Sequence, residues 1–269
     1  MLRERYFSDP EIKQLFSALA KAQQLRAVAS ITLIAHRGMG PSSSLGSQYD
    51  STVIPENTIQ AFKAAILFGA DGVELDVFQS KSGDVMVIHD DELWRNVYGV
   101  NRDGNQLPSG ESKDSYRVRQ KTTAELKKLS VGPNREQIPT LAELFKLAAE
   151  ANQLRAQQTP PEPPLILNIE LKDPESGQAC IMLIKEQILN NPNSGINFDS
   201  ICFCSFNYEC LIALKLFARE QEVENIQIAP GIKTATLFGE DNVDKANNFQ
   251  VKTGAVYKIE NLRELQQLV

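Results

Sequence analysis

The run Val-Glu-Leu-Asp-Val at residues 73–77 places two acidic residues among aliphatic ones. It belongs to a segment that predicts two short strands, Val73 to Phe78 and Asp84 to His89, joined by a polar turn. Side chains alternate faces along a strand, so Glu74 and Asp76 share one face and the aliphatic residues share the other. Neighbouring carboxylates repel each other, so this spacing requires a bound metal ion or a raised pKa.

The alternative is that the acidic face is an ordinary solvated face of an antiparallel sheet. The uniformly aliphatic opposite face disfavours this, because such strands are usually covered by helices and their acidic face then points to an interior or a barrel mouth. A buried acidic face needs a chemical reason. His89 closes the second strand and is followed by Asp90 and Asp91, so an imidazole is expected beside the carboxylates.

The preceding segment predicts a strand, a helix and a return to the acidic strand. An aliphatic strand at residues 29–35 ends in His-Arg-Gly, whose donors and flexible glycine suit anion binding. A helix follows from about Ile59, with Asn57 as the expected N-cap. Glu56 is either a carboxylate that favours the helix N-terminus or a member of the site. This strand-helix-strand order predicts a parallel sheet.

A second informative strand is expected from Leu165 to Lys172. Its aliphatic residues alternate with polar ones, so Asn168, Glu170 and Lys172 share one face. If this strand belongs to the same sheet, a third carboxylate and an ammonium group project to the side of the first pair. The alternative is a simple ion pair between Glu170 and Lys172.

The remaining pattern is that of an alternating α/β protein with one long polar insertion. The polar region at residues 95–121 is too long for an ordinary loop and predicts a lid or a small insertion. Trp94 and Tyr98 at its root either form a cage for a cationic group or, as we favour, pack. Further helices are expected at 8–28, 122–129, 138–154 and 208–221, and further strands at 200–206, 225–229 and 254–259.

Composition excludes several classes of protein. The chain has 269 residues, a net charge of −6 and a pI of about 5.2, which is typical of one large globular domain and disfavours a nucleic-acid partner. No apolar run approaches the roughly 18 residues of a transmembrane segment, and no signal peptide is evident. We therefore expect a cytoplasmic protein, with non-classical secretion as the alternative. The four cysteines are expected to be reduced, small apolar residues.

Taken together, the segments resemble the glycerophosphodiester phosphodiesterases from about Ile31 to Gly231. Each matching segment is weak alone, and their common order and spacing is specific. The matches are Ala-His-Arg-Gly at 35–38, Pro-Glu-Asn-Thr at 55–58, Gly-Ala-Asp-Gly-Val-Glu-Leu-Asp-Val at 69–77, Val-Ile-His-Asp at 87–90, Ile-Pro-Thr-Leu at 138–141, Asn-Ile-Glu-Leu-Lys at 168–172 and Ser-Phe at 205–206.

The resemblance implies an α/β fold, a (β/α)8 TIM-like barrel with its site at the carboxyl ends of the strands. An N-terminal helical extension would occupy residues 1–30 and the barrel domain residues 31–269, with residues 92–121 as the lid or insertion after the third strand. Strands are expected near residues 31, 73, 84, 165, 201, 226 and 255, with no clear eighth strand. The barrel is thus expected to be incomplete at its C-terminal end.

The resemblance also implies a set of site residues. A divalent ion, Ca²⁺ or Mg²⁺, would be held by Glu74, Asp76 and Glu170. The only two histidines of the chain, His36 and His89, fall on the catalytic acid and base positions, and we assign His89 as the acid. The same resemblance assigns Arg37 and Lys172 to phosphate binding and Glu56 to support of the site.

The implied activity is metal-dependent hydrolysis of glycerophosphodiesters to an alcohol and glycerol 3-phosphate. The sequence His-Arg-Gly-Met-Gly is most similar to the branch that acts on glycerophosphocholine. Water and the neighbouring glycerol hydroxyl both fit the role of nucleophile. Two alternatives stay open: a lysophospholipase D-type enzyme that cleaves lysophospholipids, and an inactive barrel that binds a phosphorylated ligand. The sequence assigns no oligomeric state.

Overall fold

The computed structural model describes residues 32–38, 54–94, 97, 107–132, 135–223, 226 and 228. Several predicted features lie outside these residues: the helix at 8–28, Tyr98 and the strand at 254–259. None of the helices within the described ranges combines the length and the apolar character that crossing a bilayer requires.

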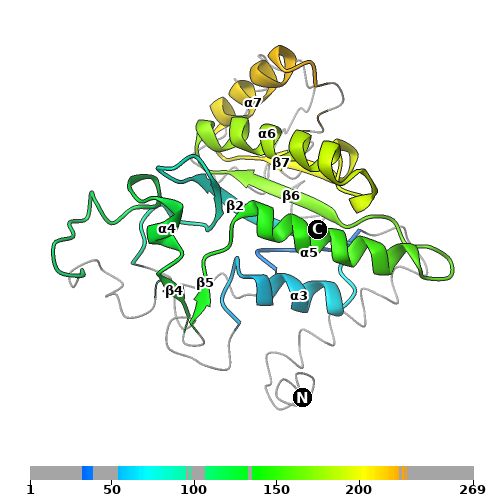
Figure 1. Cartoon of the computed structure of the whole chain (residues 1–269), viewed down its shortest axis with the longest axis horizontal. Coiled ribbons are helices and arrows are strands. Elements are labelled where there is room, and N and C mark those ends of the chain that lie inside the picture. Colours follow the sequence, from blue (N-terminus) through cyan, green and yellow to red (C-terminus); the bar gives the residue numbers. More distant parts are fainter. Residues whose placement is uncertain are drawn as a thin grey trace, which may run out of the picture.

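A twisted sheet forms the centre of the molecule (Figure 1). Four parallel strands lie in the order β1 (Ile34–Ala35), β2 (Gly72–Gln79), β6 (Ile166–Leu171) and β7 (Ile201–Cys204). The fifth, β3 (Val85–Val87), pairs with β2 in the antiparallel direction. A parallel bridge from Phe203 to Ile228 continues the order at the point where the sequence predicts the strand at 225–229.

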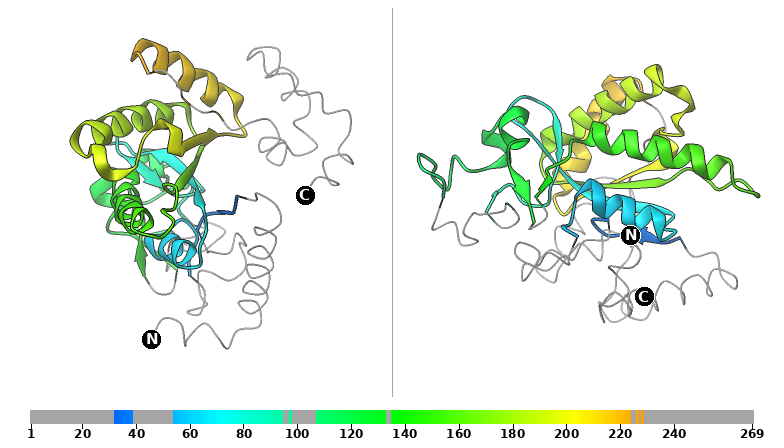
Figure 2. Two further views of the ribbon diagram at one scale, coloured as in Figure 1. Left: turned by 90° about the vertical axis from the view of Figure 1, so that its right-hand side faces the viewer. Right: turned by 60° about the horizontal axis from the view of Figure 1, so that its bottom comes forward.

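Helices connect the parallel strands and lie along one side of the sheet (Figure 2). They are α3 (Ile59–Leu67), α5 (Leu141–Ala156), α6 (Pro174–Asn190) and α7 (Tyr208–Glu220). Parallel strands that alternate with covering helices are the architecture of a (β/α)8 TIM-like barrel, as predicted. Within the described ranges the sheet is open, with β1 at one end and β7, extended by the bridge to Ile228, at the other.

The aliphatic face of the sheet forms the main core. Alternate residues of β2 and β6 point to the helices and are at most 1% exposed: Val73, Leu75, Val77, Leu167, Ile169 and Leu171. Burying each such side chain stabilises the fold by about 1.5–3 kcal/mol. The opposite face carries the acidic residues, and these are buried as well. The prediction of a covered aliphatic face with acidic side chains on the other side is therefore confirmed.

Two glycines allow neighbouring elements to approach each other closely. A Cβ atom on Gly72 would lie 2.5 Å from the carbonyl oxygen of Ile166, so the residue permits β2 to pair tightly with β6. Gly38 has φ +76°, and a Cβ there would lie 2.6 Å from the carbonyl carbon of Ala61 in α3. The turn after β1 consequently lies directly against the start of α3.

The helix starts differ from the predictions in detail. Thr58, not Asn57, caps α3, because its hydroxyl accepts the N–H of Ala61 at 3.2 Å. Thr122 caps the short helix α4 (Thr123–Leu126), as predicted, but that helix ends before the expected residue 129. Thr140 caps α5 in a capping box with Glu143, so the helix begins at 141 rather than 138.

Two further features were not predicted correctly. Helix α6 at residues 174–190 is not among the predicted helices, although Asp173 as N-cap and Pro174 at the first position are a strong start signal. Strand β3 was counted among the barrel strands, but it pairs antiparallel with the outer end of β2.

A second apolar cluster lies beside β3. It joins Met86 to residues of the predicted insertion and the segment after it, including Tyr116, Val118, Leu126 and Val131. Short paired strands β4 (Ser130–Val131) and β5 (Glu136–Gln137) adjoin it. Trp94 is partly buried against this cluster, with the ammonium of Lys113 6.0 Å from its ring centre. The favoured packing role of Trp94 is confirmed.

Candidate active site

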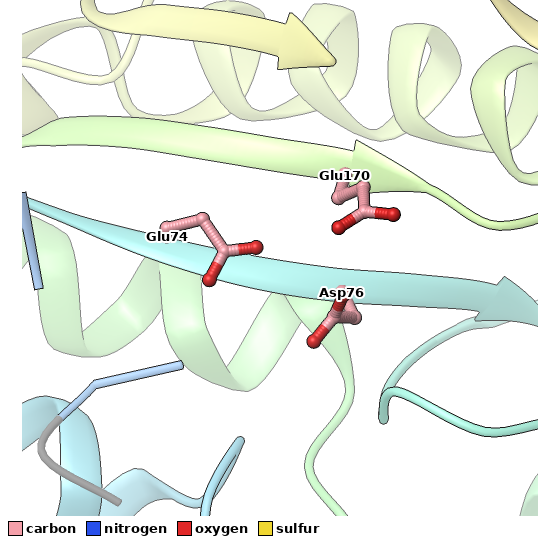
Figure 3. Close-up of side chains that lie close together, drawn as sticks. All are labelled: Glu74, Asp76 and Glu170. Atoms are coloured by element: carbon pink, nitrogen blue, oxygen red, sulfur yellow. The ribbon is translucent and has the colours of Figure 1, made fainter. Parts of the chain in front are cut away.

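Three buried carboxylates converge on the polar face of the sheet (Figure 3). Glu74 and Asp76 project from β2, and Glu170 projects from β6. One carboxylate oxygen of each residue lies within 4.8 Å of those of the other two. The parallel register makes Asp76 and Glu170 direct partners in adjacent strands, so backbone hydrogen bonds set their separation.

Burial makes this concentration of negative charge costly. Burial raises the pKa of Glu74 well above its usual value, and the Asp76 charge adds to the effect. Burial also raises the pKa of Glu170, although Lys172 opposes it. Burial alone would raise the pKa of Asp76, but the charges of Lys172, His89 and Arg37 outweigh it and the pKa is lowered. The positive charges are therefore concentrated around Asp76, and the negative charge of Glu74 is the least compensated of the three.

Lys172 brings an ammonium group into the cluster from the end of β6. Its Nζ lies 2.5 Å from Oε1 of Glu170 and 2.9 Å from Oδ1 of Asp76. These two charges outweigh the effect of burial and raise the pKa of Lys172. The ion pair that the sequence analysis considered as an alternative is thus present, and it lies inside the carboxylate cluster.

Arg37 connects the turn after β1 to the same cluster. Its Nη1 lies 3.1 Å from both carboxylate oxygens of Glu56, and its Nε lies 3.2 Å from Oδ2 of Asp76. Its backbone N–H donates to Oε2 of Glu74 at 2.8 Å. Glu56 is 4% exposed, so it is a buried partner of Arg37 and not a solvated carboxylate at a helix end.

Both imidazoles lie at this end of the sheet. Nε2 of His36 is 3.8 Å from Oε2 of Glu74, and the side chain is about half exposed. Burial, followed by the Arg37 charge, lowers the pKa of His36, and a charge on His89 acts in the same direction. Nδ1 of His89 lies 2.5 Å from Oδ1 of Asp90. Because an ionised carboxylate only accepts, Nδ1 of His89 donates this bond and Nε2 is the nitrogen left to face a reactant.

One residue of the cluster was missed as a site residue. Asn57, expected to be a helix cap, instead donates from Nδ2 to Oδ2 of Asp76 at 2.7 Å and accepts the Asp76 N–H at 3.2 Å. Its place in the Pro-Glu-Asn-Thr segment was the available signal, but a polar residue before a helix is more often a cap.

Two residues of the next strands share the acidic face. Asn168 pairs with Glu74 in the register, and Cys204 pairs with Glu170. Burial, then the charge of Glu170, raises the pKa of the Cys204 thiol well above its usual value, which keeps the thiol protonated. All four cysteines are free and buried, as predicted.

The oxygen atoms of the cluster fit a hard divalent cation. Four carboxylates, of Glu56, Glu74, Asp76 and Glu170, are compensated by the cations of Arg37 and Lys172, which leaves two negative charges when all the acids are ionised. Among the described atoms, Oδ1 of Asp76 and Oδ1 of Asn168 are buried acceptors that receive no hydrogen bond. The Lys172 ammonium forms an ion pair with Oδ1 of Asp76 at 2.9 Å. Carboxylate and carbonyl oxygens are the ligands that Ca²⁺ and Mg²⁺ prefer.

Comparison with protein families identifies one match over most of the chain. Residues 36–262 match the model of the "Glycerophosphoryl diester phosphodiesterase family". A glycerophosphodiester phosphodiesterase of Caldanaerobacter subterraneus subsp. tengcongensis is 34% identical over 213 residues, which are 77% of this chain and 66% of that protein. The chain thus spans just under two thirds of the length of this relative.

Solved structures with the same fold exist at low sequence identity. One from Galdieria sulphuraria, provisionally named a glycerophosphodiester phosphodiesterase, has a TM-score of 0.50 at 22% identity, over 81% of this chain and 71% of the other. Another of that provisional name, from Silicibacter pomeroyi, has a TM-score of 0.50 at 18% identity, over 74% of this chain and 63% of the other. At these identities the likeness concerns the fold.

Proposed function

The chain belongs to the glycerophosphoryl diester phosphodiesterase family, and from this premise we propose that it hydrolyses glycerophosphodiesters to an alcohol and glycerol 3-phosphate with the help of a divalent cation. The observation that carries the proposal is the convergence of Glu74, Asp76 and Glu170 beside both histidines of the chain. A site with an excess of buried negative charge next to two proton-transfer groups suits a reaction in which a bound cation and an acid-base pair act together.

The residues that would hold the cation are the three converging carboxylates. Ca²⁺ and Mg²⁺ both suit these ligands. When bound, the cation supplies positive charge that stabilises the negative charge developing on the phosphoryl oxygens. Lys172 and Arg37 add positive charge on the same side, Lys172 from its ion pairs with Asp76 and Glu170 and Arg37 from its ion pair with Glu56.

Acid-base chemistry is assigned to the two imidazoles. His36, whose pKa is lowered by burial and Arg37, is neutral near pH 7 and suits the role of general base. His89, held by Asp90 through Nδ1, presents Nε2 and suits the role of general acid toward the departing alkoxide. Water and the neighbouring glycerol hydroxyl remain the two candidate nucleophiles, and each would lose its proton to His36. Water would give glycerol 3-phosphate directly, whereas the hydroxyl would expel the alcohol and form a cyclic glycerophosphate, which water must then open to glycerol 3-phosphate.

Magnitudes support the need for all these parts. Enzymes accelerate reactions by about 10⁶ to 10¹⁷, and phosphate esters require the upper part of this range or more. One positioned acid or base contributes only about 10² to 10⁴. Two histidines therefore leave most of the acceleration to electrostatic stabilisation by the cation and by Lys172 and Arg37.

The direct test is an assay with defined phosphodiesters. We would incubate the protein with glycerophosphocholine and, separately, glycerophosphoethanolamine, in Ca²⁺, in Mg²⁺ and in EDTA, and identify the products by mass spectrometry. Release of choline and glycerol 3-phosphate that EDTA abolishes is the expected result, and glycerophosphocholine is the substrate that we propose. Absence of product from both substrates in either cation would contradict the proposal and favour a barrel that only binds a phosphorylated ligand.

The same assay separates the neighbouring activity on lipids. Lysophosphatidylcholine carries the same head group on an acylated glycerol, so it serves as the matched substrate. Turnover of lysophosphatidylcholine above that of glycerophosphocholine would assign the protein to lysophospholipase D-type cleavage instead. Phosphocholine as product would show that the opposite ester bond is cleaved.

A further inference from the structure

Asn57 contacts one member of the carboxylate cluster, Asp76, from an unusual backbone conformation. It lies in the turn before α3, is 3% exposed, and has φ +55°. This left-handed conformation is uncommon for residues other than glycine, and asparagine tolerates it better than most. Because Thr58 caps α3, the Asn57 side chain is not used to start the helix.

Both ends of the Asn57 carboxamide are bound to Asp76. Nδ2 donates to Oδ2 of Asp76 at 2.7 Å, and Oδ1 accepts the backbone N–H of Asp76 at 3.2 Å. The backbone N–H of Asn57 in turn donates to the carbonyl oxygen of Arg37 at 3.0 Å. The turn is thus hydrogen-bonded to both the main chain and the side chain of Asp76 in β2.

The hydrogen bond from Asn57 makes the two oxygens of the Asp76 carboxylate inequivalent. Oδ2 accepts the hydrogen bond of the Asn57 amide, and the Arg37 Nε lies 3.2 Å from it as an ion-pair partner. Oδ1 receives no hydrogen bond and has the Lys172 ammonium at 2.9 Å as a charged neighbour. Oδ1 is therefore the oxygen that the turn leaves unbound, and it lies on the side of Lys172 and Glu170.

We propose that Asn57 is a positioning residue that fixes the Asp76 carboxylate with Oδ1 on the side of the cluster, where a divalent cation would bind. The proposal rests on the proposed cation site and adds a residue to it. Asn57 acts through Asp76 and has no contact with the reacting atoms. Residues that orient metal ligands in this way typically change metal affinity or activity by about 10- to 100-fold when replaced.

The central variant is Asn57→Gly. Glycine adopts φ +55° without strain, so the substitution removes the carboxamide and leaves the turn able to form. Asn57→Asp is the second variant, because it keeps an oxygen that can accept the Asp76 N–H but replaces the amide donor by an oxygen that repels the Asp76 carboxylate. Thr58→Ala is the matched control: it removes the cap of α3 one residue away, at a cost of about 1 kcal/mol, and does not touch Asp76.

The measurement is isothermal titration of Ca²⁺ and of Mg²⁺ into each full-length protein, with thermal unfolding in EDTA as the measure of stability. We expect cation affinity to fall about 10- to 100-fold in Asn57→Gly and at least as far in Asn57→Asp. Thr58→Ala should lower the unfolding temperature and keep the wild-type affinity. Raising the cation concentration should restore part of the turnover of Asn57→Gly, with the KM for glycerophosphocholine little changed.

The outcomes separate this inference from the proposed function. Wild-type cation binding together with an affinity within about twofold in Asn57→Gly would overturn the positioning role alone. An equal loss of affinity in Thr58→Ala would also overturn it, because the effect would then follow from α3 stability. A wild-type protein that binds neither cation would overturn both the cation site and the role assigned to Asn57.

Discussion

Lys172, the residue after β6, has its ammonium group 2.9 Å from Oδ1 of Asp76 on the neighbouring strand β2. The same ammonium lies 2.5 Å from Glu170, so it is shared between two of the three converging carboxylates. Positive charge inside the cluster thus comes partly from the chain itself. The Lys172 ammonium neutralises part of the negative charge that a divalent cation would neutralise. The ammonium should therefore weaken the binding of the divalent cation.

Replacing Lys172 should therefore separate cation binding from turnover. In Lys172→Met the ammonium is lost and the length of the side chain is nearly kept. We expect Ca²⁺ to bind about tenfold more tightly, which corresponds to roughly 1.4 kcal/mol, because the repulsion is gone. Turnover should fall, because the same charge is proposed to bind phosphate. Titration calorimetry and the phosphodiester assay check the two effects, and weaker cation binding would contradict this reasoning.

Replacing His89 should lower turnover without changing cation binding. His89→Ala removes the proposed general acid and no cation ligand, so cation affinity should remain that of the wild type. Turnover should fall by at least about a hundredfold, the lower end of what a positioned acid contributes. The measurement is kcat together with calorimetric cation binding. Near-normal turnover would end the acid-base assignment of this histidine.

The pH dependence of kcat/KM should report His36. Burial and the Arg37 charge lower its pKa below the ordinary value of 6.5, so the imidazole stays neutral to a lower pH than an exposed histidine. A base must be neutral to act, and activity is therefore lost only as the pH falls through this lowered pKa. We expect the acid limb of the profile to have its midpoint below 6.5. A midpoint above that value would contradict the role of His36 as base.

Glu74 should limit the stability of the cation-free protein. Its pKa is raised in the folded state by burial and by Asp76, so its contribution to folding is unfavourable once the pH rises above the unfolded value of 4.5. Glu74→Gln removes that charge and should raise the unfolding temperature in EDTA at pH 7 by a few degrees, about 2–4 °C per kcal/mol. It should also abolish the stabilisation that Ca²⁺ or Mg²⁺ gives the wild type.

The control for this experiment is Glu186→Gln on the exposed side of α6. It changes the net charge of the protein by the same amount, far from any buried carboxylate, and should leave both unfolding temperatures unchanged. Destabilisation of Glu74→Gln in EDTA would show that the carboxylate is favourable to folding without a cation.

Gly38 offers a test of the close contact between the turn and α3. Gly38→Ala would place a Cβ 2.6 Å from the Ala61 backbone at φ +76°, and we expect a loss of at least about 2 kcal/mol in the free energy of unfolding. Gly83 also has positive φ, at +95°, but nothing lies within 4 Å of its added Cβ. Gly83→Ala should therefore cost only about 1 kcal/mol. Equal losses in denaturant unfolding would mean that the contact with α3 is unimportant.

The parts of the site that follow from strand periodicity were predictable from sequence. Alternation alone placed Glu74 with Asp76 and Glu170 with Lys172, and the aliphatic opposite faces indicated which side the helices cover. The convergence of these side chains also requires the two strands to be adjacent, and the register of Asp76 with Glu170 shows that they are. Periodicity succeeds here because each strand is long enough to show its pattern.

The parts that depend on competition between neighbouring residues were not predictable. Asn57 and Thr58 are both good helix caps, and only the packing of the turn on β2 decides that Thr58 caps while Asn57 binds Asp76. The burial of Glu56 depends likewise on a tertiary partner, Arg37. Helix α6, in contrast, has a recognisable start signal in Asp173 and Pro174. The short turn between β2 and β3 was predicted correctly, and such a turn implies antiparallel pairing, so β3 should not have been counted as a barrel strand.

The register that pairs Asp76 with Glu170 has a further consequence for protein engineering. Since the two carboxylates sit across one step of a parallel ladder, their spacing is an intrinsic repeat of β structure and does not rely on long loops. If the two strands were grafted in the same alignment onto an unrelated barrel, the acidic pair should therefore have the same spacing there. The host protein would still need an amide in the position of Asn57 to orient the Asp76 carboxylate.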